Sequence, residues 1–434
     1  MSTEWNNRMF DRDINDQRYL NVWFNTSLIG QLHEHKGLWQ FEYAQDWTGF
    51  DLCPALPVMN KVLVDGSSQR PVQWFFDNLL PEEGARYLLA KDAAVDQADA
   101  FSLLEHFGSE SAGALTLLQG DERPGEGGKT PLLPEELSKR IRDLPHVSLS
   151  QGSSKRMSLA GAQHKLPVIY QAKSGQLFEP SAAMPSTHIL KPNHSDPSSY
   201  PHTVVNEYTM MRLGRRLGLD VPDVNLVRVP EPVYLVKRFD RLKKDTLTHR
   251  LHVLDACQLL SIDRVFKYQQ CNQQSLERIV FLCRQKASTR QKLFAWFVFN
   301  LLIGNTDNHL KNLSFYAGSG DVILCPFYDL LSTAIYESRI HWKQASLVWP
   351  IGHAKTLGEV TRKDLLKLAS LLKLSDRYAN NQIDKMRNQC LLSFKLIAEE
   401  FESSPYDGLI KAGELRFLRQ LEYMLIREMS EQLE

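Results

Sequence analysis

The run LFAWFVFNLLIGNTDNHLKNLSFY, residues 293–316, constrains the fold more than any other part of the chain. Its first half repeats large apolar residues at the spacing of one helical face and therefore predicts a buried helix. These residues are Phe294, Phe297, Val298, Leu301 and Leu302. Gly304 ends the predicted helix, and a strand is expected from Leu313. The polar residues between them are therefore expected in a rigid loop mounted on two core elements.

Composition excludes several classes of protein. The 51 basic and 51 acidic residues balance, so no net charge attracts nucleic acid. The six cysteines form no CxxC pair, which indicates reduced core thiols of a cytoplasmic protein rather than a zinc or redox site. The polar first twenty residues do not resemble a secretory signal, and the longest apolar run, near residue 300, is too short to cross a membrane.

The pattern along the chain predicts an α+β fold in five parts. Alternation in YLNVWFNTSLIGQL predicts one half-buried strand over residues 19–32. A β-rich lobe with one helix is then expected before a mostly helical lobe. The predicted parts are a flexible arm at 1–18, an α+β subdomain at 19–119, a linker at 120–146, the β-rich lobe at 147–240 and the helical lobe at 241–434.

The predicted linker contains a triplet, Gly128-Lys129-Thr130, that is similar to the end of a phosphate-binding loop. The full motif GxxxxGK[ST] requires glycine at position 123, which is Arg123 here. We therefore interpret the triplet as part of a flexible linker rich in Gly, Pro and charge.

Asp307 and Asn312 in the polar loop have the spacing at which kinases place a catalytic carboxylate and a metal-binding amide. Asp329 ends the segment VILCPFYD, and a hairpin with a Gly-Ser-Gly turn would return it to Asn312 as a second metal ligand. The structural alternatives are a polar turn bonded to its own backbone and an Asp that caps the next helix. Lys311 could neutralise phosphate charge, and His309 could support the loop or the nucleotide.

Two upstream features fit the same chemistry. Lys191 ends a predicted strand and Glu207 lies on the next predicted helix, an order that matches the kinase pair holding nucleotide phosphates. Each residue taken alone favours the structural alternative, an exposed Lys before a proline and an exposed helical Glu. Their position before the other three residues in the sequence raises the functional interpretation. The small residues of RMSLAGAQHK, 156–165, would let backbone amides approach phosphates, although a plain hairpin is the alternative. A phosphate on Ser158 would disturb such a loop.

With these residues in place, the chain resembles the HipA family of bacterial serine/threonine kinase toxins. The resemblance rests on FFDNLLPE, SAGALTLL, SLAGAQHK, THILKP, NEY, KRFDR, GNTDNHLKN and PFYDLLS, in that order. It implies a two-lobed protein-kinase-like fold with a small β-rich N-terminal subdomain and a mostly α-helical C-terminal lobe. It also implies that ATP and Mg²⁺ are bound.

The resemblance implies a role for each matching residue. Asp307 would be catalytic, Asn312 and Asp329 would hold Mg²⁺, and Ser158 would be autophosphorylated, which would silence the enzyme. The implied nucleotide contacts are Ala160, Gly161, Ala162, Gln163, His164, Lys165, Lys191, Glu207, Lys237, Arg238, Phe239, His309, Leu310, Lys311, Asn312, Tyr328 and Asp329. The hinge departs from the family's best-known member, which has an acid where this chain has Lys237, although backbone contacts to adenine would survive.

The resemblance also implies partners. They are a small helix-turn-helix antitoxin of the HipB type, operator DNA reached through it, and an aminoacyl-tRNA synthetase as substrate, the glutamyl enzyme foremost. Phosphorylation of that synthetase would inhibit translation and promote growth arrest and persistence. Two other functions stay open at this point: a nucleotide-binding scaffold that acts as a corepressor without catalysis, and a small-molecule kinase.

Overall fold

The structure is a computed structural model, and it describes residues 18–150, 159, 163–244, 247–318, 320–337, 341–405 and 409–434. Within these ranges all six cysteines are free thiols in buried positions, as the sequence predicts. No helix in the described residues is both long and apolar enough to span a bilayer.

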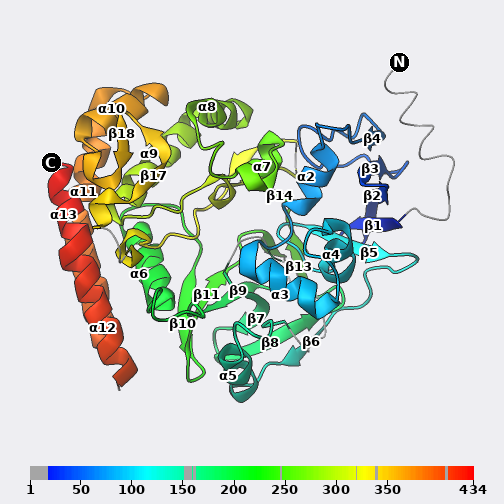
Figure 1. The fold of residues 1–434 in the computed structure, drawn as a ribbon, viewed down its shortest axis with the longest axis horizontal. Coiled ribbons are helices and arrows are strands. Elements are labelled where there is room, and N and C mark those ends of the chain that lie inside the picture. The colour runs from blue at the N-terminus through cyan, green and yellow to red at the C-terminus, as the bar shows by residue number, and fades with distance from the viewer. Residues whose placement is uncertain are drawn as a thin grey trace. The chain divides into compact units, whose positions relative to one another are not determined.

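The chain divides into two compact units that alternate along the sequence. The first unit comprises residues 1–189, 238–266 and 315–322, and the second comprises 190–237, 267–314 and 323–434. Each unit therefore draws on segments that lie far apart in the sequence, whereas the five predicted parts are contiguous ranges. Most of the helices and many of the strands of both units are labelled in Figure 1.

The first unit opens with an antiparallel sheet of strand order β4-β3-β2-β1-β5. The prediction of a single strand over 19–32 is wrong, because the chain turns at Asn25 with a φ of 52° and forms a hairpin. Asn tolerates this left-handed conformation, which explains the turn. The strands are β1 (Arg18–Phe24), β2 (Ser27–His35), β3 (Leu38–Tyr43), β4 (Val62–Val64) and β5 (Leu115–Gln119).

Three helices connect β4 to β5, and each has an apolar side that is buried. The buried side chains of α4 include Phe101, Leu104 and Phe107, and Phe101 meets Trp39 of β3 edge to face at 5.4 Å. Apolar burial of this kind is the main favourable term in folding. These helices are α2 (Pro71–Asp77), α3 (Glu83–Ala93) and α4 (Ala100–Phe107).

The range predicted as a linker carries a strand and a helix. Strand β6 pairs antiparallel with β8, and β8 pairs with β7. Gly128, Lys129 and Thr130 lie in β6, so the triplet is part of a ladder, and the Lys129 ammonium lies 4.2 Å from the centre of the Phe178 ring. The elements are β6 (Gly128–Pro131), α5 (Pro134–Arg142), β7 (Leu166–Gln171), β8 (Gln176–Ser181) and β9 (His188–Pro192), which runs into the second unit.

The later segments of the first unit add short elements. A hairpin and a strand lead into a helix that Asp255 caps, with its side chain accepting from the Gln258 amide at 2.8 Å. They are β12 (Arg241–Lys244), β13 (Leu247–Arg250), β14 (Val253–Asp255), α7 (Ala256–Leu260) and the 3₁₀ turn η2 (Arg264–Phe266).

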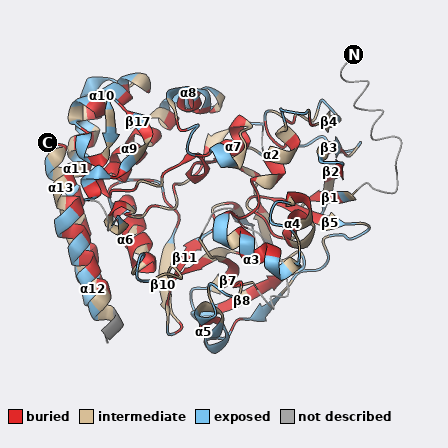
Figure 2. Cartoon of the chain, viewed as in Figure 1, coloured by how far each residue is buried: buried red, intermediate tan, exposed pale blue. Residues whose placement is uncertain are grey.

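The second unit is mainly helical. The predicted helix before Gly304 is confirmed as α9, whose side chains from Trp296 to Leu302 are all buried, and Figure 2 shows α9 largely in the buried colour. This second half of α9 is buried on every side because it lies inside the unit, whereas Lys286 and Gln291 in the first half are exposed. The first elements of this unit are α6 (Thr203–Arg216), β10 (Val224–Arg228), β11 (Pro232–Lys237), α8 (Gln273–Leu282) and α9 (Lys286–Leu302).

The remaining segments complete the second unit. The long helix α11 buries one stripe that includes Ile383, Cys390 and Ile397. A partly buried ion pair joins Arg228 of β10 to the buried Glu414 of α12 at 2.5 Å. The elements are η3 (Leu310–Asn312), β15 (Ser314–Tyr316), which runs into the first unit, β16 (Ile323–Leu324), η4 (Ala334–Tyr336), η5 (Trp342–Gln344), β17 (Ser346–Ile351), β18 (Ala354–Thr356), η6 (Leu357–Glu359), α10 (Arg362–Leu371), α11 (Asp376–Glu402), α12 (Leu409–Leu421), the π-helical turn η7 (Glu422–Ile426) and α13 (Arg427–Gln432).

Candidate active site

Lys191, Glu207 and Asp329 meet inside the second unit, although Lys191 and Asp329 lie 138 residues apart in the sequence. The Lys191 ammonium donates to Oε1 of Glu207 at 2.8 Å and pairs with Oδ1 of Asp329. Lys191 lies near the end of β9 and Glu207 on α6, and both side chains are buried. Burial acts to lower the pKa of Lys191, but the Asp329 and Glu207 carboxylates outweigh it and raise this pKa above its ordinary value.

Tyr234 on β11 lies beside this cluster. Its ring centre is 5.8 Å from the Lys191 ammonium, and its side chain is fully buried. Burial and then the charges of Glu207 and Asp329 raise the pKa of Tyr234 well above its ordinary value. Among the described residues its hydroxyl oxygen has no hydrogen-bond partner. A buried hydroxyl of this kind usually has a partner, so a ligand in the cluster would satisfy it.

The loop that carries Asp307 is braced by its own amides. Asn300 accepts from Asn305 at 2.7 Å through Oδ1, and Asn305 accepts from the Asp307 amide at 3.0 Å through Oδ1. Nδ2 of Asn312 donates to the backbone oxygen of Asp307 at 2.8 Å. An amide binds a hard cation through its oxygen and not through its nitrogen, so Oδ1 of Asn312 is the atom suited to hold a cation.

Two aromatic side chains fix this loop from other elements of the second unit. Trp349 of β17 donates through Nε1 to the backbone oxygen of Asn308 at 2.6 Å. The Tyr268 hydroxyl donates to Oδ1 of Asp307 at 2.6 Å, and the Tyr268 ring meets His309 edge to face at 4.9 Å. His309, Leu310 and Lys311 are all buried.

The segment that ends in Asp329 is bonded directly to the loop. The Tyr328 hydroxyl donates to the backbone oxygen of Lys311 at 2.7 Å, so the residue before Asp329 contacts the residue before Asn312. Nδ2 of Asn305 lies 3.4 Å from the backbone oxygen of Asp329. Asp329 itself has a φ of 52°, a left-handed conformation in which Asp is tolerated better than most residues.

Asn206, a residue that the site prediction missed, holds the chain just after Asp329. Its Nδ2 donates to the backbone oxygen of Ser332 at 2.8 Å, and its Oδ1 accepts from the Ser332 amide at 2.9 Å. Asn206 therefore orders this segment from the same helix that presents Glu207. The signal available in the sequence was the adjacency of an amide to Glu207 in the quoted block NEY.

The predicted hinge residues have different surroundings. The Lys237 side chain is exposed and its ammonium lies 3.6 Å from Oδ2 of Asp223, both in the second unit. The Arg238 guanidinium belongs to the first unit, where Asp240 at 2.6 Å and Glu110 at 3.2 Å hold it. Its side chain is thus committed to ion pairs. Phe239, half-buried, accepts through its backbone oxygen from the Tyr316 hydroxyl at 3.1 Å.

The predicted phosphate loop is described only in part. Ser158, Ala160, Gly161 and Ala162 lie outside the described residues. Gln163, His164 and Lys165 are described in the first unit, half-buried, directly before β7.

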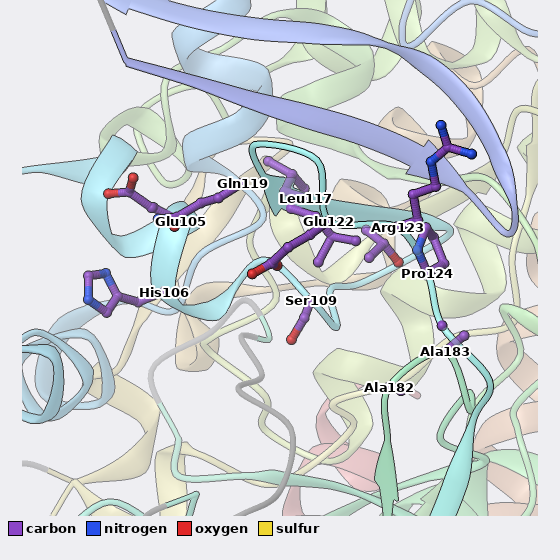
Figure 3. A pocket seen from close by; sticks show the side chains of 13 residues that line it. Glu105, His106, Ser109, Leu117, Gln119, Glu122, Arg123, Pro124, Ala182 and Ala183 are labelled. Atoms are coloured by element: carbon purple, nitrogen blue, oxygen red, sulfur yellow. The ribbon is translucent and has the colours of Figure 1, made fainter.

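A pocket of about 530 Å³ lies elsewhere, in the first unit, and Figure 3 shows its lining. Glu105 and His106 of α4 line it together with Glu122 and Arg123, the position at which the phosphate-loop motif fails. Of the predicted nucleotide-binding residues that the structure describes, none lines this pocket, and its two carboxylates would repel a phosphate.

The donor set fits a magnesium–nucleotide complex. Mg²⁺ is usually held by one or two carboxylates together with substrate phosphates rather than by a dedicated protein cage. Among the described residues no group of three His, Cys, Asp or Glu side chains could hold a metal alone. Asp329 and the Asn312 amide would instead provide oxygen ligands for the metal, and the buried Lys191 ammonium would provide a phosphate-binding cation, as in a kinase.

Fold and site thus define a kinase-like protein, and comparison with known proteins specifies the family. The HipA N-terminal domain matches residues 20–118 and the HipA-like C-terminal domain matches residues 157–393. The chain belongs to the HipA family of serine/threonine kinase toxins.

Individual relatives agree. The chain is 33% identical over 79% of its length to a putative kinase, Y4mE, of Sinorhizobium fredii, and covers 83% of it. It is 32% identical over 68% of its length to the serine/threonine-protein kinase toxin HipA of Shewanella oneidensis, covering 70% of that chain. A chain in a solved complex of Shewanella oneidensis HipA, HipB and operator DNA matches with a TM-score of 0.78 and 25% identity, over 95% of this chain and 97% of that one. This similarity bears out the predicted α+β kinase-like fold.

Proposed function

We propose that the chain is an ATP- and Mg²⁺-dependent serine/threonine protein kinase and the toxin of a toxin–antitoxin pair. The observation that carries this proposal is the buried contact of Lys191 with both Glu207 and Asp329. A buried lysine held by two carboxylates, one from a helix and one from the segment bonded to the Asp307 loop, is the arrangement that positions nucleotide phosphates in kinases. The relative from Shewanella oneidensis bears the name of such a kinase toxin.

Each side chain would have a separate task. Lys191, oriented by Glu207, would bind phosphate oxygens, while Asp329 and the Asn312 oxygen would hold Mg²⁺. Asp307, fixed through Asn305, would orient the acceptor hydroxyl and take its proton. When bound, the magnesium–nucleotide complex supplies the phosphoryl group and offsets its charge.

The partners and the regulation are part of the same proposal. The solved complex that this chain resembles contains HipB and operator DNA, which supports a HipB-like antitoxin that carries this chain to operator DNA. We further propose an aminoacyl-tRNA synthetase, the glutamyl enzyme foremost, as the substrate, with growth arrest and persistence as the outcome. Autophosphorylation at Ser158 would silence the enzyme.

The test is Asp307→Asn. We expect phosphate incorporation from γ-labelled ATP to fall at least about 100-fold, and growth arrest on expression to be lost. The matched control is Asp384→Asn, a carboxylate of α11 paired with Arg362 at 2.6 Å, which should leave both readouts unchanged. A variant Asp307→Asn that still arrests growth as strongly as the wild type would instead support a non-catalytic scaffold. Phosphoproteomic comparison of cells with and without the chain identifies the substrate.

A further inference from the structure

Tyr268 bonds the carboxylate that the proposed function assigns to catalysis, yet it belongs to none of the motifs in the sequence. Its hydroxyl lies 2.6 Å from Oδ1 of Asp307, 39 residues further along the chain. The residue is 40% exposed, so its ring is accessible from solvent while its hydroxyl is engaged. Both residues lie in the second unit.

The position of Tyr268 is fixed by its neighbours. The backbone oxygen of Lys267 accepts from the Leu310 amide at 3.3 Å and from the Cys271 thiol at 3.0 Å. The Lys267 ammonium lies 5.0 Å from the centre of the Tyr268 ring, and the ring meets His309 at an interplanar angle of 84°. The segment from Lys267 to Cys271 is thus attached to the loop that carries Asp307, and the hydroxyl has a defined direction.

We infer that Tyr268 is a positioning residue on the acceptor side of the active site, an inference that rests on the proposed function. A carboxylate has two oxygens with several lone pairs, so Tyr268 and an acceptor hydroxyl can bond the same group at once. Donation from Tyr268 restricts rotation of the Asp307 carboxylate and presents its basic oxygens in one orientation. The exposed ring then forms the surface against which the segment carrying the acceptor serine or threonine lies.

The geometry favours this role over that of an ordinary surface tyrosine. A small error in the placement of a catalytic group can cost about 100-fold in rate. A hydrogen bond to a charged group held at 2.6 Å is strong enough to prevent such an error.

Tyr268→Phe tests the inference, because it removes the hydroxyl and keeps the ring against His309 and Lys267. Phosphate release from ATP and incorporation of label into the chain are measured with Mg²⁺ over a range of ATP concentrations. We expect the maximal rates of both reactions to fall about tenfold, with the half-saturating ATP concentration and the melting temperature unchanged. Tyr268→Ala, which also removes the ring, should lower incorporation further than it lowers release to water.

The control is Tyr423→Phe, an exposed tyrosine of η7 whose ring lies 4.9 Å from the Arg427 guanidinium carbon, and it should match the wild type. A Tyr268→Phe variant with wild-type maximal rates overturns the positioning role and leaves the kinase proposal standing. A parallel shift in melting temperature and half-saturating ATP points to a merely structural role and also overturns it. A wild-type chain that neither hydrolyses ATP nor transfers phosphate overturns the proposed function itself.

Discussion

Asn206 shows how a single amide can order a segment that carries no motif of its own. Its two hydrogen bonds satisfy both backbone groups of Ser332, which is fully buried. Nδ2 also donates to the Tyr336 hydroxyl at 2.9 Å. Asp329 lies three residues before Ser332, so the conformation of the proposed metal ligand depends on this amide.

Replacement of Asn206 by Ala should therefore reduce both stability and activity. The Ser332 amide would be left buried without its acceptor, which costs about 2 kcal/mol in the free energy of unfolding. Urea denaturation of the full chain measures the loss, and labelled ATP measures the accompanying fall in phosphate transfer. Gln273→Ala, which removes an exposed amide bonded to Glu277, should change neither quantity. Equal stability of the two variants would contradict the role given to Asn206.

Individual site residues can be predicted from the sequence where their type and their order along the chain already specify the chemistry. Lys191 and Glu207 could be paired in advance because a strand residue and a residue on the next helix are brought together by local connectivity. Tyr268 could not be found in this way, because an exposed tyrosine upstream of α8 has no distinguishing spacing relative to Asp307. Only the folded path of the chain brings the two side chains together.

Helix α9 and the loop after it form a mount for Asp307. Gly304 makes the change of direction with a φ of 60°, and its backbone oxygen accepts from the Ala334 amide at 3.0 Å. A Cβ added at Gly304 would lie 2.7 Å from Cδ1 of Leu425 on η7. The sequence predicted the end of the helix here, and the structure adds the close packing.

Gly304→Ala should therefore destabilise the protein by about 2 kcal/mol, from the left-handed backbone and the contact with Leu425. Thermal and urea unfolding measure the change. The comparison variant is Gly37→Ala. Gly37 has a φ of 78°, and a Cβ added there would meet no atom within 4 Å. This variant therefore isolates the contribution of the left-handed backbone. If Gly304→Ala costs no more than Gly37→Ala, the packing against Leu425 has no energetic weight.

The strands were harder to predict than the helices for a physical reason. The alternation over residues 19–32 continues through the turn at Asn25, so periodicity alone joins two strands into one. Strand β6 obtains its partner β8 only some fifty residues later, as Thr130 faces Glu179. The segment around β6 is rich in Gly, Pro and charged residues, and this composition does not indicate that it pairs with a strand so far along the chain.

At the scale of the molecule, a buried group of charges joins the two HipA family domains within the first unit. Glu110 comes from the N-terminal domain, and Arg238, Asp240, Arg241 and Arg250 come from the C-terminal domain. Glu110 accepts from Arg241 at 2.9 Å and from Arg250 at 2.6 Å, and its side chain is fully buried. Burial, followed by the neighbouring charge of Arg238, lowers the pKa of Arg241 to about 10.

Glu110→Gln should consequently destabilise the whole first unit. Arg250 would lose its carboxylate partner, and Arg238 and Arg241 would share the single carboxylate of Asp240. Breaking a buried pair from one side costs about 3–5 kcal/mol. Urea denaturation, monitored by tryptophan fluorescence, measures the loss in the free energy of unfolding. Glu136→Gln on α5, where the carboxylate is 48% exposed beside Arg140, should cost less than about 1 kcal/mol. Similar losses in the two variants would show that the buried group carries no special energetic weight.

The alternation of the two units along the chain also has a consequence for biosynthesis. A ribosome must deliver residues up to 322 before the first unit holds all its parts, and up to 329 before Lys191 can meet its second carboxylate. Under the proposed function, a nascent chain would therefore lack phosphotransfer chemistry while most of its length is already translated. The emerging chain would stay inactive until residue 329 has been delivered.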